Sequence, residues 1–294
     1  MTPAKGGLLS AVVTGAACSD WIVAQCARSM LVAVVSPLLV AAGLAIAADY
    51  KPAVAQPGKN VMWVPTPDAL VERMLDLAKV GANDTVIDLG SGDGRIVILA
   101  ARRGAKALGI EYDAKLVEYA KAAAAKAGVA DRAHFTQADL FSSDISQATV
   151  VTLFLGAQLN RKLMPRLLGL KPGVRIVSNT HAVGDWPADL IVTANHDRSV
   201  YYRTALLWIV PAKVAGVWRF ADSSVTFTQR YQRVSGSITM QGKFAPVTGA
   251  TLRGDHISFS AGAVQYSGTV SGNTIAGSVT SGVASRAWRA TRAQ

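Results

Sequence analysis

The residues best suited to chemistry lie where short apolar runs end. The run VIDL at 86–89 is followed by the loop GSGDG at 90–94 and then by RIVILAA at 95–101, which has the spacing of a helix. Glycines suit such a loop because a ligand can approach the backbone more closely than a β-carbon permits, and because positive φ costs glycine little. The stretch is therefore predicted to be a strand, a ligand-binding loop and a helix.

The spacing of this loop argues against a dinucleotide. Dinucleotide sites use Gly-x-Gly-x-x-Gly, whereas Gly90, Gly92 and Gly94 are closer together, and Arg95 stands where the third glycine of that motif would be. Asp88, inside the strand, suits a cationic amino group better than a phosphate. Both features point to S-adenosylmethionine, whose amino acid end is zwitterionic and which carries no phosphate.

Two further acids end the next two predicted strands. Glu111 closes the run ALGIE and can accept hydrogen bonds from both ribose hydroxyls. Asp139 lies just past the run HFTQA and could accept the adenine amino group, while Leu140 or Phe141 packs on the ring. Alone, a glycine loop is often a tight turn and each acid a solvated or capping residue. Their order along the chain favours one site at the carboxyl edge of a parallel sheet.

These motifs resemble those of the class I, seven-strand S-adenosylmethionine-dependent methyltransferases, through VIDLGSGDGRI at 86–96, GIEYD at 109–113 and QADLF at 137–141. The lead-in VPTP and the later runs ATVVTLFL and PGVRIVSN are similar to the lysine methyltransferase family that includes the mitochondrial ATP synthase c-subunit enzyme and its bacterial and archaeal relatives. The likeness covers about residues 60–212.

The resemblance implies that a methyl group moves from S-adenosylmethionine to a lysine amine. The predicted cofactor-binding residues are Asp88, Gly90, Ser91, Gly92, Glu111, Asp139 and Leu140. The chain departs from the family after the predicted fourth strand, where relatives tend to have a proline and Phe154-Leu155 is followed here by Gly156. That departure bears on the acceptor more than on the cofactor.

Methyl transfer is an in-line displacement, so an enzyme mainly supplies alignment and desolvation and needs no covalent nucleophile. A lysine acceptor must first lose a proton, which a dry pocket lined by aromatic rings and carbonyls would favour. The side chains at strand ends that could line such a pocket are Thr66, Phe154, Asn160, Asn179, His181 and Trp186. For each, packing or a loop hydrogen bond is the alternative interpretation.

The order of apolar runs predicts an α/β fold with a Rossmann-like seven-strand methyltransferase sheet at 60–212. Expected helices lie at 68–79, 116–127 and 159–170, and expected later strands at 149–155, 174–178, 190–194 and 201–210. Segment 213–294 changes to short alternating runs separated by turn signals, which predicts a small antiparallel β domain, either a meander or a small barrel.

Segment 1–59 is expected to contribute a hydrophobic signal or anchor and a linker rather than part of the fold. Residues 31–48 carry no charge, and Ala-x-Ala triplets at 45–47 and 53–55 suit signal cleavage. A retained membrane anchor and a buried helix are the alternatives. The protein is accordingly expected to be membrane-associated or exported, and residues 49–60, rich in proline, are expected to form a linker.

The net charge of +11 is unevenly distributed: segments 1–59 and 60–212 each carry +2, and 213–294 carries +7. The arginines of that last segment are spread rather than clustered, which disfavours a nucleic-acid partner and leaves a solvated face or an anionic membrane surface. Both cysteines lie before residue 27, and the four histidines show no paired spacing with acids, so no metal site is expected.

Three functions are therefore open. The first is a protein-lysine methyltransferase. The second is a methyltransferase acting on a small molecule or a lipid. The third is an exported, non-catalytic methyltransferase fold whose β domain is a binding module.

Overall fold

The computed structural model describes residues 50–58, 60–193 and 202–293. The described residues belong to one compact unit, which begins at Tyr50. The hydrophobic run at 31–48 lies outside the described residues, so the signal or anchor remains a prediction. Among the described helices, none combines the length and the apolar character needed to cross a bilayer.

A seven-stranded sheet forms the α/β part of the unit Tyr50–Gln294, in the order β3-β2-β1-β4-β5-β7-β6. β7 runs antiparallel to both of its neighbours, whereas the pairs among β1 to β5 are parallel. The strands are β1 (Thr85–Leu89), β2 (Lys106–Glu111), β3 (Ala133–Gln137), β4 (Val150–Leu153), β5 (Arg175–Asn179), β6 (Leu190–Thr193) and β7 (Thr204–Ile209). The predicted seven-strand methyltransferase sheet is confirmed.

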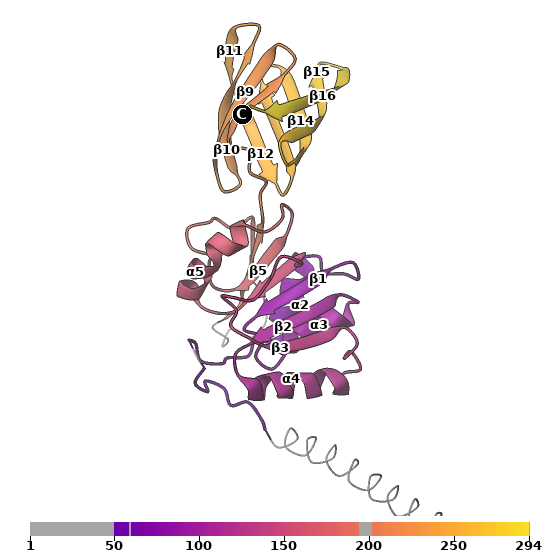
Figure 1. The fold of residues 1–294 in the computed structure, drawn as a ribbon, viewed down its shortest axis with the longest axis vertical. Coiled ribbons are helices and arrows are strands. Elements are labelled where there is room, and N and C mark those ends of the chain that lie inside the picture. Colours follow the sequence, from indigo (N-terminus) through magenta and orange to yellow (C-terminus); the bar gives the residue numbers. More distant parts are fainter. Residues whose placement is uncertain (1–49, 59, 194–201, 294) are drawn as a thin grey trace, which may run out of the picture. The chain divides into compact units, whose positions relative to one another are not determined.

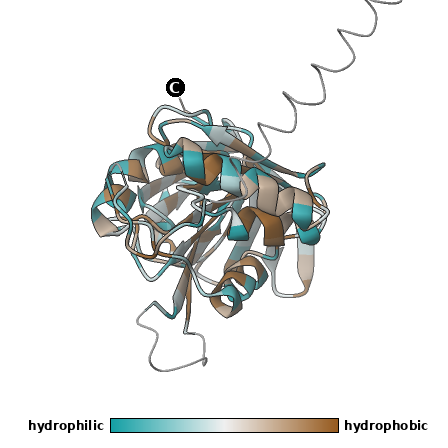
Figure 2. Ribbon diagram, turned by 90° about the horizontal axis from the view of Figure 1, so that it is seen from below, coloured by the Kyte–Doolittle hydropathy of each residue, from teal (hydrophilic) through white to brown (hydrophobic). Residues whose placement is uncertain are grey.

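Helices cover both faces of this sheet, because its central strands are apolar on both sides. In β1, Val86 belongs to one hydrophobic cluster and the next residue, Ile87, to the other. The first cluster includes residues from α2 (Asp68–Leu77), α3 (Arg95–Arg102) and α4 (Ala114–Lys126), and the second includes residues from α5 (Ala157–Leu168). Figure 1 shows α3 and α4 beside β2 and β3, and Figure 2 shows helices coloured in alternating brown and teal, as amphipathic helices should be.

The C-terminal segment forms a nine-stranded antiparallel sheet in the order β11-β10-β9-β8-β16-β15-β14-β13-β12. Its two end strands, β11 and β12, are separated in the chain only by Val247, whose N–H donates to the Gly236 carbonyl of β10, so the sheet is nearly a closed barrel. The strands are β8 (Gly216–Phe220), β9 (Ser223–Arg230), β10 (Arg233–Met240), β11 (Lys243–Pro246), β12 (Thr248–Arg253), β13 (His256–Ala261), β14 (Val264–Ser271), β15 (Thr274–Ser281) and β16 (Ala284–Arg292).

The antiparallel β domain is thus confirmed. Two of its strands, β11 and β12, show little of the apolar alternation that predicts a strand: in β11, every residue except Ala245 is exposed. The barrel encloses a core that includes Trp218, Phe227 and Tyr266. The expected domain limits at 59/60 and 212/213 stay predictions; the last strand of the first sheet ends at Ile209 and the first of the second begins at Gly216.

Candidate functional site

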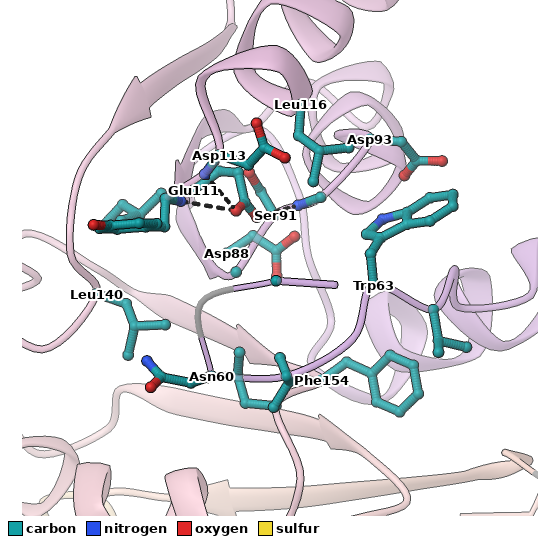
Figure 3. A pocket seen from close by; sticks show the side chains of 18 of the residues that line it. Asn60, Trp63, Asp88, Ser91, Asp93, Glu111, Asp113, Leu116, Leu140 and Phe154 are labelled. Carbon is teal, nitrogen blue, oxygen red and sulfur yellow. Dashed lines mark hydrogen bonds between the residues drawn. The ribbon is translucent and has the colours of Figure 1, made fainter. Parts of the chain in front are cut away.

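The carboxyl ends of the parallel strands meet at one edge of the seven-stranded sheet, and a cavity lies there. It encloses about 990 Å³, including space open to solvent. All seven residues predicted to bind the cofactor line it: Asp88, Gly90, Ser91, Gly92, Glu111, Asp139 and Leu140. Figure 3 shows Asp88, Ser91, Glu111 and Leu140 around one space. Residues that are up to 52 positions apart in sequence therefore converge, as the strand-end argument requires.

Asp88 is the most perturbed acid in the cavity. Its side chain is 2% exposed and accepts a 2.5 Å hydrogen bond from Thr152 Oγ1. Burial raises the pKa of Asp88 to about 7, and the nearby carboxylates of Glu111 and Asp93 act in the same direction. A buried carboxylate with one neutral partner is stabilised by a cation. The ammonium of S-adenosylmethionine fits this requirement.

Glu111 fixes the glycine loop to the end of β2. Its Oε2 accepts the Gly92 N–H at 2.9 Å, and its Oε1 accepts the N–H groups of Tyr112 and Asp113 at 2.8 and 3.0 Å. These backbone donors hold the carboxylate in one orientation. Its remaining lone pairs can accept the hydroxyls of a ribose.

The loop itself is closed by its own backbone. The N–H groups of Gly90 and Ser91 donate to the Ile110 carbonyl, and the Gly94 N–H donates to Ser91 O. Gly90, Gly92 and Gly94 all have positive φ, between 55° and 81°, which explains why glycine stands at each position. The Ser91 hydroxyl is buried without a hydrogen-bond partner in the described part of the chain, and a β-carbon on Gly109 would lie 2.6 Å from it.

Arg95 occupies the place of the third glycine and makes a connection that the sequence did not reveal. Its guanidinium pairs with Asp93 at 2.6 Å and donates to the Thr66 carbonyl at 2.9 Å, with Asp68 at 3.3 Å. The side chain therefore ties the glycine loop to the VPTP segment in front of α2.

The lining of the cavity distinguishes Leu140 from Phe141, the two alternatives predicted to pack on the adenine ring. Leu140 and Phe141 both pack against the hydrophobic cluster around α5, but of the two Leu140 alone also lines the cavity. Asp139 Oδ1 accepts the Phe141 N–H at 2.9 Å, which fixes the turn after β3. Leu140 is therefore the apolar side chain available to the ring.

The segment before the VPTP motif also lines the cavity, which the sequence analysis missed. Residues 49–60 were expected to form a linker, but Gln56 and Asn60 lie in the cavity wall, as does Trp63 just after them. The available signal was the aromatic residue directly preceding VPTP. The role of this residue, Trp63, depends on its contact with the glycine loop, and the neighbouring sequence does not predict that contact.

The acceptor-site candidates divide into two groups. Thr66 and Phe154 line the cavity, and His181 lies behind Phe154 with its ring stacked at 6.1 Å between centroids. Tyr202 meets Phe154 edge to face at 4.9 Å. His181 and Tyr202 thus support the Phe154 ring, which itself lines the cavity. Burial alone lowers the pKa of His181, which favours its neutral imidazole.

Asn160 and Asn179 lie beneath this wall rather than in the cavity. Asn160 is fully buried, and its Nδ2 donates to Ser178 Oγ at 3.2 Å and to the His181 carbonyl at 3.0 Å. Asn179 Nδ2 donates to Thr66 Oγ1 at 3.2 Å. Both amides are therefore placed to position the wall rather than to touch an acceptor.

The turn between Asn179 and His181 is strained. Thr180 has φ of 59°, a region that a β-branched residue rarely adopts. Its N–H donates to the Thr204 carbonyl and its Oγ1 to Asn179 Oδ1. Such strain persists where surrounding contacts fix it, and it clusters at functional sites.

Trp186, also an acceptor-site candidate, belongs to the core instead. It is 1% exposed, stacks on Tyr231 and donates its indole N–H to Gln232 Oε1. Trp186 therefore has a packing role, because the turn between β9 and β10 covers it. In the described ranges, no group of three or more His, Cys, Asp or Glu side chains could hold a metal ion.

Comparisons with known proteins agree with this geometry. The ANTKMT methyltransferase domain family matches residues 88–190. A protein-lysine N-methyltransferase of Saccharolobus islandicus (strain REY15A) is 43% identical over 148 residues, which are 48% of this chain and 92% of that protein. The ATP synthase c-subunit lysine N-methyltransferase of Caenorhabditis elegans is 32% identical over 146 residues, 47% of this chain and 77% of that protein.

A solved structure is also similar. The crystal structure of an RNA methyltransferase from Salinibacter ruber in complex with S-adenosyl-L-homocysteine has 48% sequence identity and a TM-score of 0.48, and the match covers 51% of this chain and 96% of that one.

The raised pKa of Asp88 predicts a pH-dependent cofactor affinity. Asp88 must ionise to pair with an ammonium, so below pH 7 binding has to remove a proton, and affinity for S-adenosylhomocysteine should fall roughly tenfold or more from pH 7.5 to pH 5.5. The stability of the free protein changes with pH in the opposite direction. Asp88 is buried most favourably when it is protonated, so its contribution to the free energy of unfolding is lost as pH rises from 3.8 through 7. Calorimetry over this range measures the affinity.

Asp88→Asn is the matched control, because it keeps the shape and the Thr152 contact but cannot ionise. Its weaker affinity should vary little over the same range. A wild-type affinity as flat as that of the variant would show that Asp88 does not pair with the cofactor.

Proposed function

Because the chain belongs to the family of class I S-adenosylmethionine-dependent methyltransferases that contains these lysine methyltransferases, we propose that it methylates a lysine side chain of a protein. The observation that carries the proposal is the 43% identity to an archaeal protein-lysine N-methyltransferase over 92% of that protein's length. The cavity supports it, since its polar groups suit a zwitterionic nucleoside and its far wall is aromatic.

The bound cofactor supplies a methyl group on a sulfonium, activated for direct transfer. Asp88 would hold the ammonium of its amino acid end, Glu111 would orient the ribose, and Leu140 would flank the adenine. The glycine loop, fixed to Glu111 and Ile110, would support the amino acid end of the cofactor. Alignment of this kind is the main catalytic contribution that in-line transfer needs.

The acceptor nitrogen must approach with its lone pair free. Phe154 forms the proposed wall on that side, and His181 stacks on it, so that the Phe154 ring would exclude water from one face of the amine. A dry, aromatic surrounding lowers the pKa of an amine and so favours the neutral form. The nitrogen then forms a bond to the methyl carbon, the carbon–sulfur pair goes to sulfur, and the surplus proton leaves the nitrogen.

The experiment that tests the function follows the label into its product. The full chain is incubated with S-adenosylmethionine labelled on the methyl group and with a cell extract, and protein, lipid and RNA fractions are separated. We expect label in protein, recovered as methyl-lysine after acid hydrolysis, and none with Asp88→Ala. Label confined to lipid, small molecules or RNA would refute lysine as the acceptor, and no label above the variant would support a non-catalytic fold.

The aromatic wall predicts the effect of changing His181. Because His181 does not line the cofactor cavity, His181→Ala should leave affinity for S-adenosylhomocysteine within about twofold while slowing methyl-lysine formation roughly ten- to a hundredfold. His181→Phe keeps a flat ring against Phe154 and is the matched control. If the phenylalanine variant is as slow as the alanine variant, the imidazole rather than the ring is required; unchanged rates in both would refute the wall.

We also propose that the run at 31–48 brings the protein to a membrane, as a retained anchor or an export signal, and that the +7 segment meets an anionic membrane surface. The supporting observations are the eighteen residues without a charge and the basic excess at 213–294. Fractionation of cells that express the full chain should recover it with membranes or outside the cytosol. Recovery only from the cytosol would contradict the proposal.

A further inference from the structure

The segment before the VPTP motif is built as a strap, defined here as residues 53–58 and 60–63. Its ends are joined by the Ala55 N–H to the Trp63 carbonyl at 2.8 Å and by the Trp63 N–H to the Gln56 carbonyl at 3.0 Å. The Gln56 side chain accepts from the Ala53 N–H and donates to the Tyr50 hydroxyl. The strap is therefore closed on itself by its own hydrogen bonds.

Both sides of the strap are attached to the cofactor-binding fold. Tyr50 packs edge to face on Tyr119 of α4, with ring centroids 6.3 Å apart. At the other side the chain continues into Thr66, whose carbonyl accepts the Arg95 guanidinium. In Figure 3 the strap passes along the cavity, with Asn60 drawn towards Leu140 and Trp63 towards Asp93.

Trp63 lies against the glycine loop. A β-carbon on Gly92 would come within 2.8 Å of Trp63 Cδ1, closer than real side chains approach, so the indole packs where only glycine leaves room. Trp63 also lines the cavity. Its Nε1–H is at this contact and has no hydrogen-bond partner among residues 50–58, 60–193 and 202–293, whereas the indole N–H groups of Trp186, Trp208, Trp218 and Trp288 all donate to an oxygen.

The amino acid end of the cofactor brings a carboxylate as well as an ammonium, and few of the backbone N–H groups of the loop are left to bind it. The N–H groups of Gly90, Ser91 and Gly94 donate to backbone carbonyls, and that of Gly92 to Glu111. Arg95, which directly follows the loop, is already paired with Asp93 and Asp68 and bound to the Thr66 carbonyl.

A carboxylate in a partly buried site needs donors. We propose that Trp63 is a cofactor-recognition residue, whose indole N–H donates to the carboxylate of S-adenosylmethionine while its ring covers the glycine loop. Asp88 and Trp63 then divide the zwitterion between them, the first taking the cation and the second the anion. This inference rests on cofactor use and adds a residue that motif reasoning does not reach.

The test combines a change in the protein with a change in the ligand. Trp63→Phe keeps a ring over Gly92 and removes the donor, and decarboxylated S-adenosylmethionine keeps the sulfonium, the amine and the nucleoside but lacks the carboxylate. By calorimetry with the full chain, we expect the variant to bind S-adenosylmethionine roughly tenfold or more weakly than wild type. Its affinity for the decarboxylated ligand should stay within about twofold of wild type. The difference between the two effects measures the interaction of the indole N–H with the carboxylate, as in a double-mutant cycle.

Trp288→Phe is the matched control, because it removes an indole donor from the antiparallel sheet, and it should bind both ligands as wild type does. Thermal unfolding of each variant establishes that it is folded. Equal affinities of wild type and Trp63→Phe for S-adenosylmethionine would overturn the inference. Equal weakening for both ligands would also overturn it, since the ring rather than the donor would then matter. Failure of the wild type to bind either ligand would instead refute cofactor use itself.

Discussion

The buried carboxylate of Asp88 is the constraint around which the site is arranged. In the register of the sheet, Asp88 is opposite Gly109 on β2 and Thr152 on β4. The glycine leaves space for the loop that follows β1, and the threonine supplies the single hydroxyl that the carboxylate accepts. Burial of an acid in this way is unfavourable unless a cation arrives, so the fold maintains a site whose electrostatics are completed by its ligand.

The cofactor side could be predicted because its signals are local. Each acid lies at or near the end of its own apolar run, and parallel strands bring their carboxyl ends to one edge whatever the exact strand limits. The prediction therefore survived errors at the ends of elements. The expected strand at 149–155 is Val150–Leu153, and the helix expected at 116–127 begins two residues earlier, where Asp113 caps it.

The acceptor side and the strap could not be predicted because their meaning lies in long-range contacts. Asn179 bonds Thr66 across 113 positions, and Arg95 reaches the same residue's carbonyl across 29. From the sequence, Asn160 and Trp186 looked equivalent to Phe154 as candidates. Only the packing distinguishes a buried amide that holds a turn, an indole in the core and a ring that lines the cavity.

The replacement of the third glycine by Arg95 has a structural consequence beyond ligand choice. From Asp93, contacts run through Arg95 to Thr66, from Thr66 to Asn179, and from Asn179 to Thr180. The glycine loop is thus joined to the strained turn that carries His181. In-line transfer requires the methyl donor and the acceptor to be aligned with each other. A glycine at position 95 would lack this side-chain connection and would leave only the shared sheet, in which β1, β4 and β5 are neighbours, to position the two parts of the site.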